Sequence, residues 1–172
     1  KTNINRFIKN ITNDYFFTDT SKENLSFVIE ISKKLKLKNH LLFNTIQNFK
    51  GLRYRQQVIL KKNNLIIIND SKSTSFSSTV SILKTKSNIY WLLGGIYKKG
   101  DRLNLQRNEA PNVKAFIYGK NKKFFNKELK NKVSFKNFDN LDDGFKNIVN
   151  LIKKENLSYS TFLFSPCAAS FD

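Results

Sequence analysis

The sequence of 172 residues is poor in cysteine, proline and glycine. It contains one cysteine, two prolines, six glycines and no methionine. A single cysteine excludes a disulfide within the chain, which is typical of a reducing compartment. No stretch approaches the roughly 20 apolar residues that cross a bilayer, and residues 1–13 lack the apolar core of a signal peptide. The few glycines and prolines therefore mark specific turns.

Acidic residues are also scarce. The 13 Asp and Glu residues oppose 31 Lys and Arg residues, which gives a formal net charge of +18. Such a charge can indicate nucleic-acid binding, or it can reflect lysine-rich compositional drift that anionic substrates tolerate. The basic residues are spread along the chain and lysine far outnumbers arginine, which favours the second interpretation. The hydrophobic content of 40% is enough for a buried core.

The apolar patterning predicts strands that alternate with helices. We expect strands at 57–60, 65–68, 89–93, 113–118, 133–135 and 161–164, and helices at 24–36, 39–48, around 80–83, 121–129 and 142–154. Asn63 and Asn64 split the first two strands, which predicts a hairpin. This order predicts an α/β fold with an open, mostly parallel sheet of Rossmann type. Ligands bind such sheets beyond the carboxyl ends of the strands. No glycine fingerprint for a dinucleotide follows the first strand.

Polar residues follow the strand at 65–68. The segment Asn69–Thr74 combines hydroxyl side chains with the charge of Lys72, and a strand-to-helix turn adds backbone N–H groups that suit anionic ligands. Asp70 could accept hydrogen bonds from a sugar hydroxyl. The alternative interpretation is a plain N-cap cluster for the following helix.

Two further segments carry basic residues beside strands. Gly94–Asp101 follows the strand at 89–93, and its glycines permit close approach of a ligand whose carboxylate Lys98 could pair with. Arg53 and Arg55 precede the first strand and could bind phosphate. A solvated loop and a solvated linker are the respective alternatives.

Small residues follow the last predicted strand. Ser165–Asp172 leaves room for a ligand, and Ser170 offers a hydroxyl. Cys167 would need a nearby base to act as a nucleophile, but the only histidine, His40, lies far away in the sequence. We therefore expect a buried structural thiol at Cys167 and a surface position for His40.

Four segments in this order resemble the Mur ligase family. FKGLRYRQQV at 49–58 is similar to the F-x-G-L-x-H-R-x-E segment that opens the family's C-terminal domain. INDSKST at 68–74 resembles I-N-D-S-K-A-T, and WLLGGIYKKGD at 91–101 resembles L-L-G-G-x-x-K-x-x-D. LFSPCAASFD at 163–172 is similar to L-L-S-P-A-x-A-S-F-D, which is typical of members that add D-glutamate. Residues 23–35 look like the end of the family's central ATPase domain, with Asn24 as the clear match.

This resemblance implies a ligase of peptidoglycan synthesis. ATP would phosphorylate the carboxylate of UDP-N-acetylmuramoyl-L-alanine, and the amine of D-glutamate would attack the acyl phosphate, with Mg²⁺ neutralising charge. Arg55 and Asp70 would contact ATP, and Lys72 would line the cleft. D-glutamate would be held by Thr74, Lys98, Ser170 and Phe171. The resemblance places no catalytic residue and no metal ligand in this chain.

The resemblance also implies a domain organisation. Residues 1–50 would end a central ATP-binding domain, and residues 51–172 would form the amino-acid-binding C-terminal domain without its final segment. The phosphate-binding loop of the family is missing, so we expect a fragment that is inactive alone, from a cytoplasmic monomer that binds neither nucleic acid nor membrane. Tyr54 and Glu23 stand where the family has histidines. Another Mur ligase, a folylpolyglutamate synthase and, less favoured, a basic nucleic-acid-binding module remain alternatives.

Overall fold

The structure, a computed structural model, describes residues 9–169 except for the side chains of Asp14, Phe17 and Asp19. The chain divides into two compact units, residues 1–51 and 52–172. Within residues 9–169, none of the helices combines the length and the apolar character that crossing a membrane requires.

The first unit is helical. It contains the short 3-10 helix η1 (Asp14–Phe17) and the helices α2 (Asp19–Lys34) and α3 (Asn39–Gln47). Its core is small and centres on Leu25, Ile29 and Ile46. The side chain of Asn13 donates hydrogen bonds to the carbonyls of Ile46 and Phe49, each at 2.8 Å, and so satisfies the carboxyl end of α3.

The apolar stripe expected on the helix at 24–36 is buried only in part. Leu25 and Ile29 are buried, whereas Val28, Ile31 and Leu35 are exposed. Leu25 and Ile29 lie four residues apart and share one helix face, whereas the other three follow the i, i+3, i+7 spacing of an adjacent face. The helix also begins earlier than expected, at Asp19, because Thr18 caps it by accepting a hydrogen bond from the Ser21 N–H.

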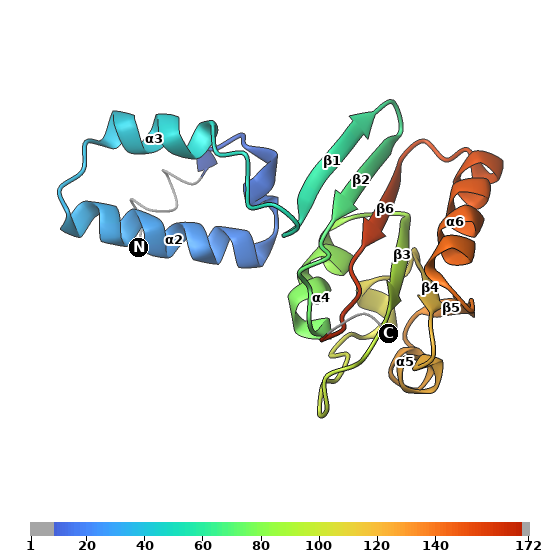
Figure 1. The fold of residues 1–172 in the computed structure, drawn as a ribbon. Coiled ribbons are helices and arrows are strands. Elements are labelled where there is room, and N and C mark those ends of the chain that lie inside the picture. The colour runs from blue at the N-terminus through green and yellow to red at the C-terminus, as the bar shows by residue number, and fades with distance from the viewer. Residues whose placement is uncertain (1–8, 170–172) are drawn as a thin grey trace. The chain divides into compact units, whose positions relative to one another are not determined.

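The second unit is an α/β domain with one six-stranded sheet (Figure 1). Its strands are β1 (Gln57–Lys62), β2 (Leu65–Asn69), β3 (Ile89–Gly94), β4 (Val113–Tyr118), β5 (Ser134–Asn137) and β6 (Ser160–Phe164). Its helices are α4 (Phe76–Thr85), α5 (Lys122–Leu129), α6 (Leu141–Glu155) and the short 3-10 helix η2 (Arg107–Glu109).

The strand order is β1-β2-β6-β3-β4-β5. The hairpin β1–β2 is antiparallel, and all other neighbouring strands are parallel. The mostly parallel sheet predicted from the sequence is therefore confirmed. The last strand, β6, lies between β2 and β3, and this insertion decides which loops meet at the carboxyl ends of the strands.

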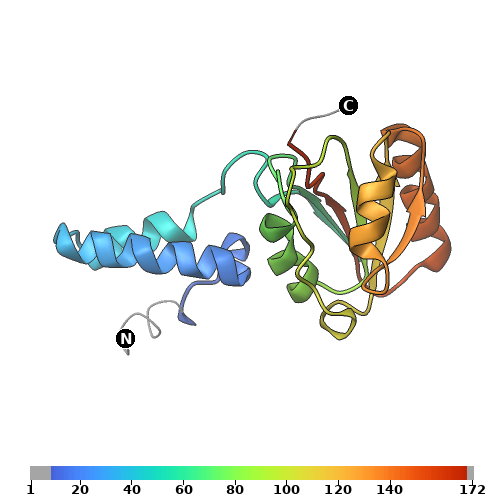
Figure 2. The same ribbon diagram turned by 90° about the horizontal axis from the view of Figure 1, so that it is seen from below.

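Helices cover both faces of the sheet (Figure 2). One core joins α4 and α5 to side chains such as Trp91 and Leu93, and a second core joins α6 to Tyr90 and Leu92. Successive residues of β3 point to opposite faces, which explains why the whole strand is buried and reads as a continuous apolar run.

The ends of α6 show why the helix begins and stops where it does. The Asn140 side chain accepts a hydrogen bond from the Asp143 N–H at 2.9 Å and caps the amino end. Lys153 and Lys154 lie in the last turn, where cations are favourable. Asn156 then adopts a left-handed conformation with φ of 41° and ends the helix.

Candidate functional site

Three polar loops follow neighbouring strands at the same end of the sheet. The β2 loop comprises residues 70–75, the β3 loop residues 95–106 and the β6 loop residues 165–169. Because β2, β6 and β3 are adjacent and parallel, their carboxyl ends and these loops lie together. This is the position at which open α/β sheets bind ligands.

Hydrogen bonds join each pair of these loops. The bonds run from the Ala169 N–H to the Ile96 carbonyl (2.7 Å), from the Phe76 N–H directly after the β2 loop to the Asp101 carboxylate (2.8 Å), and between Ser73 Oγ and Cys167 Sγ (3.7 Å). Hydrogen bonds therefore hold the three loops together.

The side chains expected to meet ligands are exposed, on the β2 and β3 loops and on the segment before β1. Arg55, Lys72, Thr74 and Lys98 all reach solvent. The β2 loop with Thr74 and the β3 loop with Lys98 are brought together by the bond between Asp101 and the start of α4. Ser170 and Phe171, the other residues expected to hold D-glutamate, lie outside the described residues.

Asp70 is buried beneath this surface. It is 4% exposed, and its two carboxylate oxygens accept hydrogen bonds from the Gln56 N–H at 3.0 Å and the Ser165 hydroxyl at 2.9 Å. Burial raises its pKa from 3.8 to about 6, and the bonds from Gln56 and Ser165 and the charge of Arg55 offset part of that rise. The Asp70 carboxylate is therefore a buried and hydrogen-bonded part of the fold, whereas the sequence indicated only a possible ligand contact.

A chain of buried hydroxyls continues from Asp70. Thr79 Oγ1 lies 2.6 Å from Ser165 Oγ, 2.9 Å from Ser73 Oγ and 3.1 Å from Cys167 Sγ. These atoms link α4 to the β2 and β6 loops. Thr79 could not be predicted from the sequence, because a single hydroxyl in a helix carries no recognisable signal. Ser165 belongs to the predicted segment 165–172, but its bond to Asp70 joins residues far apart in the sequence.

Cys167 is a buried structural thiol, as expected from the sequence. It is fully buried, and burial raises its pKa to about 12, although hydrogen bonds with Thr79, Ser73 and Ser165 lower it in part. A fully buried thiol with a raised pKa has little thiolate character at neutral pH, as is typical of structural cysteines. His40 is exposed on α3, in agreement with its expected surface position.

The segment before β1 lies against the β2 loop. The Lys72 N–H donates to the Tyr54 carbonyl at 3.0 Å, and the Gln56 N–H binds Asp70. Tyr54 adopts a left-handed conformation with φ of 65°, which turns the chain toward this contact. Arg55 and Asp70, the two residues expected to contact a nucleotide, are consequently close enough for the arginine charge to act on the carboxylate.

Other features of the described residues do not add to this site. Among residues 9–169, His, Cys, Asp and Glu side chains form no group of three that could hold a metal ion. A groove of about 350 Å³ lies at the opposite ends of the strands, lined by residues that include Leu60, Leu65, Ile152 and Ser160. Its charged lining residues are Lys62 and Lys153, and it lies away from the three polar loops.

Two curated proteins similar to this chain carry the same name. No protein-family model matches the chain. UDP-N-acetylmuramoylalanine–D-glutamate ligase of Wolbachia pipientis wMel is 33% identical over 156 residues, covering 89% of this chain and 30% of that protein. The protein of the same name from Wolbachia sp. subsp. Brugia malayi is 31% identical over 153 residues, with 89% and 30% covered. The chain spans about a third of the length of these relatives and matches their C-terminal part.

Solved structures agree on the fold. MurF from Acinetobacter baumannii superposes with a TM-score of 0.66 at 16% identity, covering 87% of this chain and 34% of that chain. At such low identity the likeness concerns the fold alone. The mostly parallel α/β architecture expected from the resemblance to Mur ligases is therefore confirmed.

Proposed function

We propose, from its relationship to the C-terminal part of Mur ligases named for D-glutamate addition, that this chain is the amino-acid-binding part of such an enzyme. The complete ligase would join D-glutamate to UDP-N-acetylmuramoyl-L-alanine with ATP, in cytoplasmic peptidoglycan synthesis that serves cell-wall growth and division. Residues 51–172 would hold the amino acid, and residues 1–50 would end the ATP-binding domain. Residues 1–172 alone would not turn over.

One observation carries this proposal. Hydrogen bonds join the β2, β3 and β6 loops pairwise, and the exposed Lys72, Thr74 and Lys98 lie on them. A carboxylate is well matched by an ammonium group and a hydroxyl donor. A connected set of loops also keeps these donors in place before the ligand arrives, which lowers the cost of ordering them on binding.

The proposed role of the site is to orient an amine. Lys98 and Thr74, with Ser170 and Phe171, would hold the carboxylates of D-glutamate and leave its amine free. The amine nitrogen would bond to the carbonyl carbon of the acyl phosphate, phosphate would leave with the electron pair of the broken C–O bond, and the amine would lose a proton. Fixing the two reactants in this geometry can contribute much of the rate enhancement.

Arg55 and Asp70 would serve the nucleotide. The exposed Arg55 could bind phosphate, and Lys72 would line the cleft between them and the amino acid. Asp70 already accepts two hydrogen bonds, but each carboxylate oxygen has a second lone pair that a ribose hydroxyl could use. Among residues 9–169 no group of three His, Cys, Asp or Glu side chains could hold a metal ion, and we propose no Mg²⁺ ligand and no step for the ion there.

The other candidate functions have less support. The curated relatives reported above carry a name for D-glutamate addition, which favours this member over other Mur ligases and over folylpolyglutamate synthases. A nucleic-acid-binding module would be expected to gather its charge on one face, whereas the basic residues here are distributed along the sequence.

The Lys98→Ala variant of the full-length ligase tests the proposal. We expect its KM for D-glutamate to rise by at least about tenfold, because a charge-assisted hydrogen bond contributes about 1.5–3 kcal/mol. Lys99→Ala is the matched control, because Lys99 is an adjacent exposed lysine in the same loop. Steady-state kinetics with varied D-glutamate measures both variants.

Equal KM values for the two variants would remove Lys98 from the D-glutamate site. A wild-type enzyme that releases phosphate with L-glutamate as readily as with D-glutamate would refute the proposed substrate. The nucleic-acid alternative would instead be supported by DNA or RNA binding that weakens steeply with salt.

A further inference from the structure

Lys98 lies in the β3 loop at the carboxyl end of β3, and hydrogen bonds and an aromatic contact anchor this loop. The loop begins at Gly95 and contains Gly100, which have φ of 115° and 84°. Glycines leave a loop free to adopt many conformations. A loop that must present a single charge to a ligand therefore needs fixed points elsewhere.

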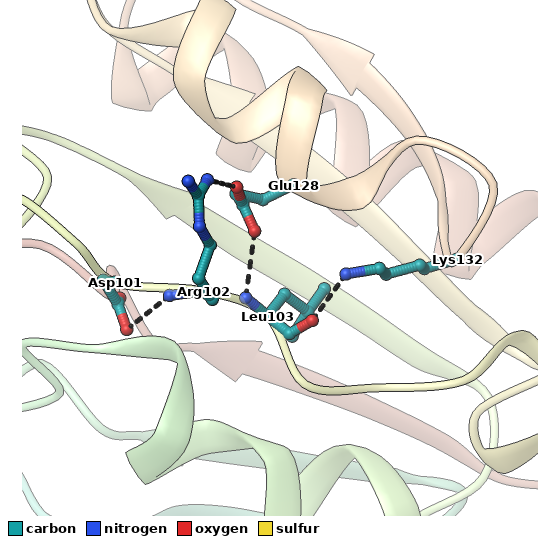
Figure 3. A network of polar contacts seen from close by, with 5 residues as sticks. All are labelled: Asp101, Arg102, Leu103, Glu128 and Lys132. Atoms are coloured by element: carbon teal, nitrogen blue, oxygen red, sulfur yellow. Dashed lines mark hydrogen bonds and ion pairs between the residues drawn. The ribbon is translucent and has the colours of Figure 1, made fainter.

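The main fixed point is Glu128 of α5 (Figure 3). Its side chain is 6% exposed, and one carboxylate oxygen pairs with the guanidinium of Arg102. The other oxygen accepts a hydrogen bond from the Leu103 N–H at 3.1 Å. The Lys132 ammonium group donates a hydrogen bond to the Leu103 carbonyl at 2.5 Å. Both the N–H and the carbonyl of Leu103 are thus bound by residues of α5 and of the turn after it.

Asp101 connects Arg102 and Leu103 to the β2 loop and to the turn that contains Lys98. One Asp101 oxygen accepts a bond from its neighbour, the Arg102 N–H, at 3.1 Å. The other accepts from the Phe76 N–H at 2.8 Å, two residues after Thr74. The Asp101 N–H in turn donates to the Lys98 carbonyl at 3.1 Å and closes the turn that presents Lys98.

An aromatic contact holds the tip of the same loop. The ring of Tyr97 stacks on that of Phe124 of α5, with centroids 3.9 Å apart and planes inclined by 10°. The position of Lys98 is thus set from α5 on both sides of the turn, by ring stacking before it and by Glu128 after it.

We propose that Glu128 is a positioning residue for the amino-acid site, which fixes the β3 loop with Lys98 relative to the β2 loop with Thr74. It touches neither substrate nor reacting atoms and acts through Arg102, Leu103 and Asp101. This inference rests on the proposed function, since it assigns the site an amino acid with carboxylates. A buried carboxylate is costly without partners, and here Arg102 and the Leu103 N–H supply them.

The Glu128→Gln variant of the full-length ligase tests the effect on the substrate. Glutamine can still accept from the Leu103 N–H, but its amide group then faces the Arg102 guanidinium, donor against donor. We expect the KM for D-glutamate to rise about tenfold and the KM for ATP to change less than about twofold. Arg102→Ala should also raise the KM for D-glutamate. This variant should fold normally, because the Arg102 side chain is 65% exposed.

Glu155→Gln is the matched control. Glu155 also belongs to a helix and accepts hydrogen bonds from two donors, Tyr90 and Lys114. It lies beside the beginning of β3 and β4, at the other end of the strands from Lys98. A loss of general stability would affect both variants, whereas a positioning role predicts a D-glutamate effect for Glu128→Gln alone.

Amide hydrogen exchange in residues 1–172 tests the coupling without any ligand. We expect Glu128→Gln to speed exchange of both the Leu103 and Phe76 amides by about tenfold, and Glu155→Gln to leave them unchanged. Faster exchange at Leu103 with unchanged exchange at Phe76 would show that Glu128 acts only locally and would overturn the inference.

The kinetic outcomes separate this inference from the proposed function. If Lys98→Ala raises the KM for D-glutamate while Glu128→Gln matches Glu155→Gln, Glu128 has no positioning role although the site stands. If Lys98→Ala has no effect, the proposed site itself is wrong, and the inference is wrong with it.

Discussion

Asp70 and Glu128 are two buried carboxylates whose pKa values move in opposite directions. Burial raises the pKa of both groups, and at Asp70 it prevails because the hydrogen-bond donors are a neutral amide and a neutral hydroxyl. At Glu128 the bond from Arg102, the Leu103 N–H and the charges of Arg102 and Lys132 outweigh burial and lower the pKa. The identity of the donors, and not burial alone, decides the protonation of each group.

Asp70 should make stability fall as pH rises from about 4 to about 6. Its folded-state pKa of about 6 exceeds its ordinary value of 3.8, so the unfolded chain releases the proton first. Its contribution is complete below the unfolded pKa and lost once pH passes the folded pKa, a change of about 3 kcal/mol at most. Asp70→Asn should remove this decline.

Urea unfolding of both proteins at several pH values measures this effect. The difference between the two curves isolates Asp70 from the other carboxylates, whose contributions are common to both. A difference that stays constant between pH 4 and 6, or that grows in favour of the wild type, would contradict a raised pKa.

Gly94 at the end of β3 and Gly100 in the β3 loop, which flank Lys98 in the sequence, have distinct roles. Gly94 ends β3 with φ of 150°, and a Cβ atom there would stand 2.3 Å from the Tyr118 carbonyl oxygen of β4. Gly100 lies in the β3 loop with φ of 84°, and a Cβ atom there would meet nothing within 4 Å. The first glycine permits close packing of strands, and the second only permits a backbone conformation.

Alanine substitutions should separate these two roles. Gly94→Ala must displace β4 and should lower the free energy of unfolding by more than about 3 kcal/mol. Gly100→Ala should cost only about 1–2 kcal/mol, the penalty of a left-handed residue. Denaturant unfolding followed by the fluorescence of Trp91, the sole and fully buried tryptophan, measures both. Similar midpoints for the two variants would show that Gly94 is not tightly packed.

The molecule consists of two compact units whose hydrophobic cores differ in size. The second unit, residues 52–172, contains two cores on opposite faces of a sheet and all described residues of the candidate site. The first unit has a core centred on three buried side chains. A core of this size supports only marginal stability in a short chain.

Residues 52–172 should therefore fold without residues 1–51. We expect the shorter protein to keep the unfolding free energy reported by Trp91 within about 1 kcal/mol and to keep the amide spectrum of the sheet. Nuclear magnetic resonance and denaturant unfolding of the two chain lengths make the comparison. Loss of the dispersed amide signals in the shorter protein would mean that the first unit is needed for the fold of the second.

The sequence by itself determined the elements and the polar loops that follow the strands. The strand pattern, the hairpin at Asn63 and Asn64, and the polar loops around Thr74 and Lys98 follow from residues close to one another in the chain, because periodicity and turn chemistry are local properties. Those predictions agree with the structure in element type and order. The roles assigned to the loop residues stay predictions.

Only the tertiary structure decided how these elements meet. It placed β6 between β2 and β3, buried Asp70 under Ser165 and set Glu128 against the β3 loop. Each of these pairings joins residues that are far apart in the sequence, where no local pattern records the partner. Parallel strand order and buried polar contacts depend on long-range crossovers and on the packing of whole helices. They therefore become visible only in the folded structure.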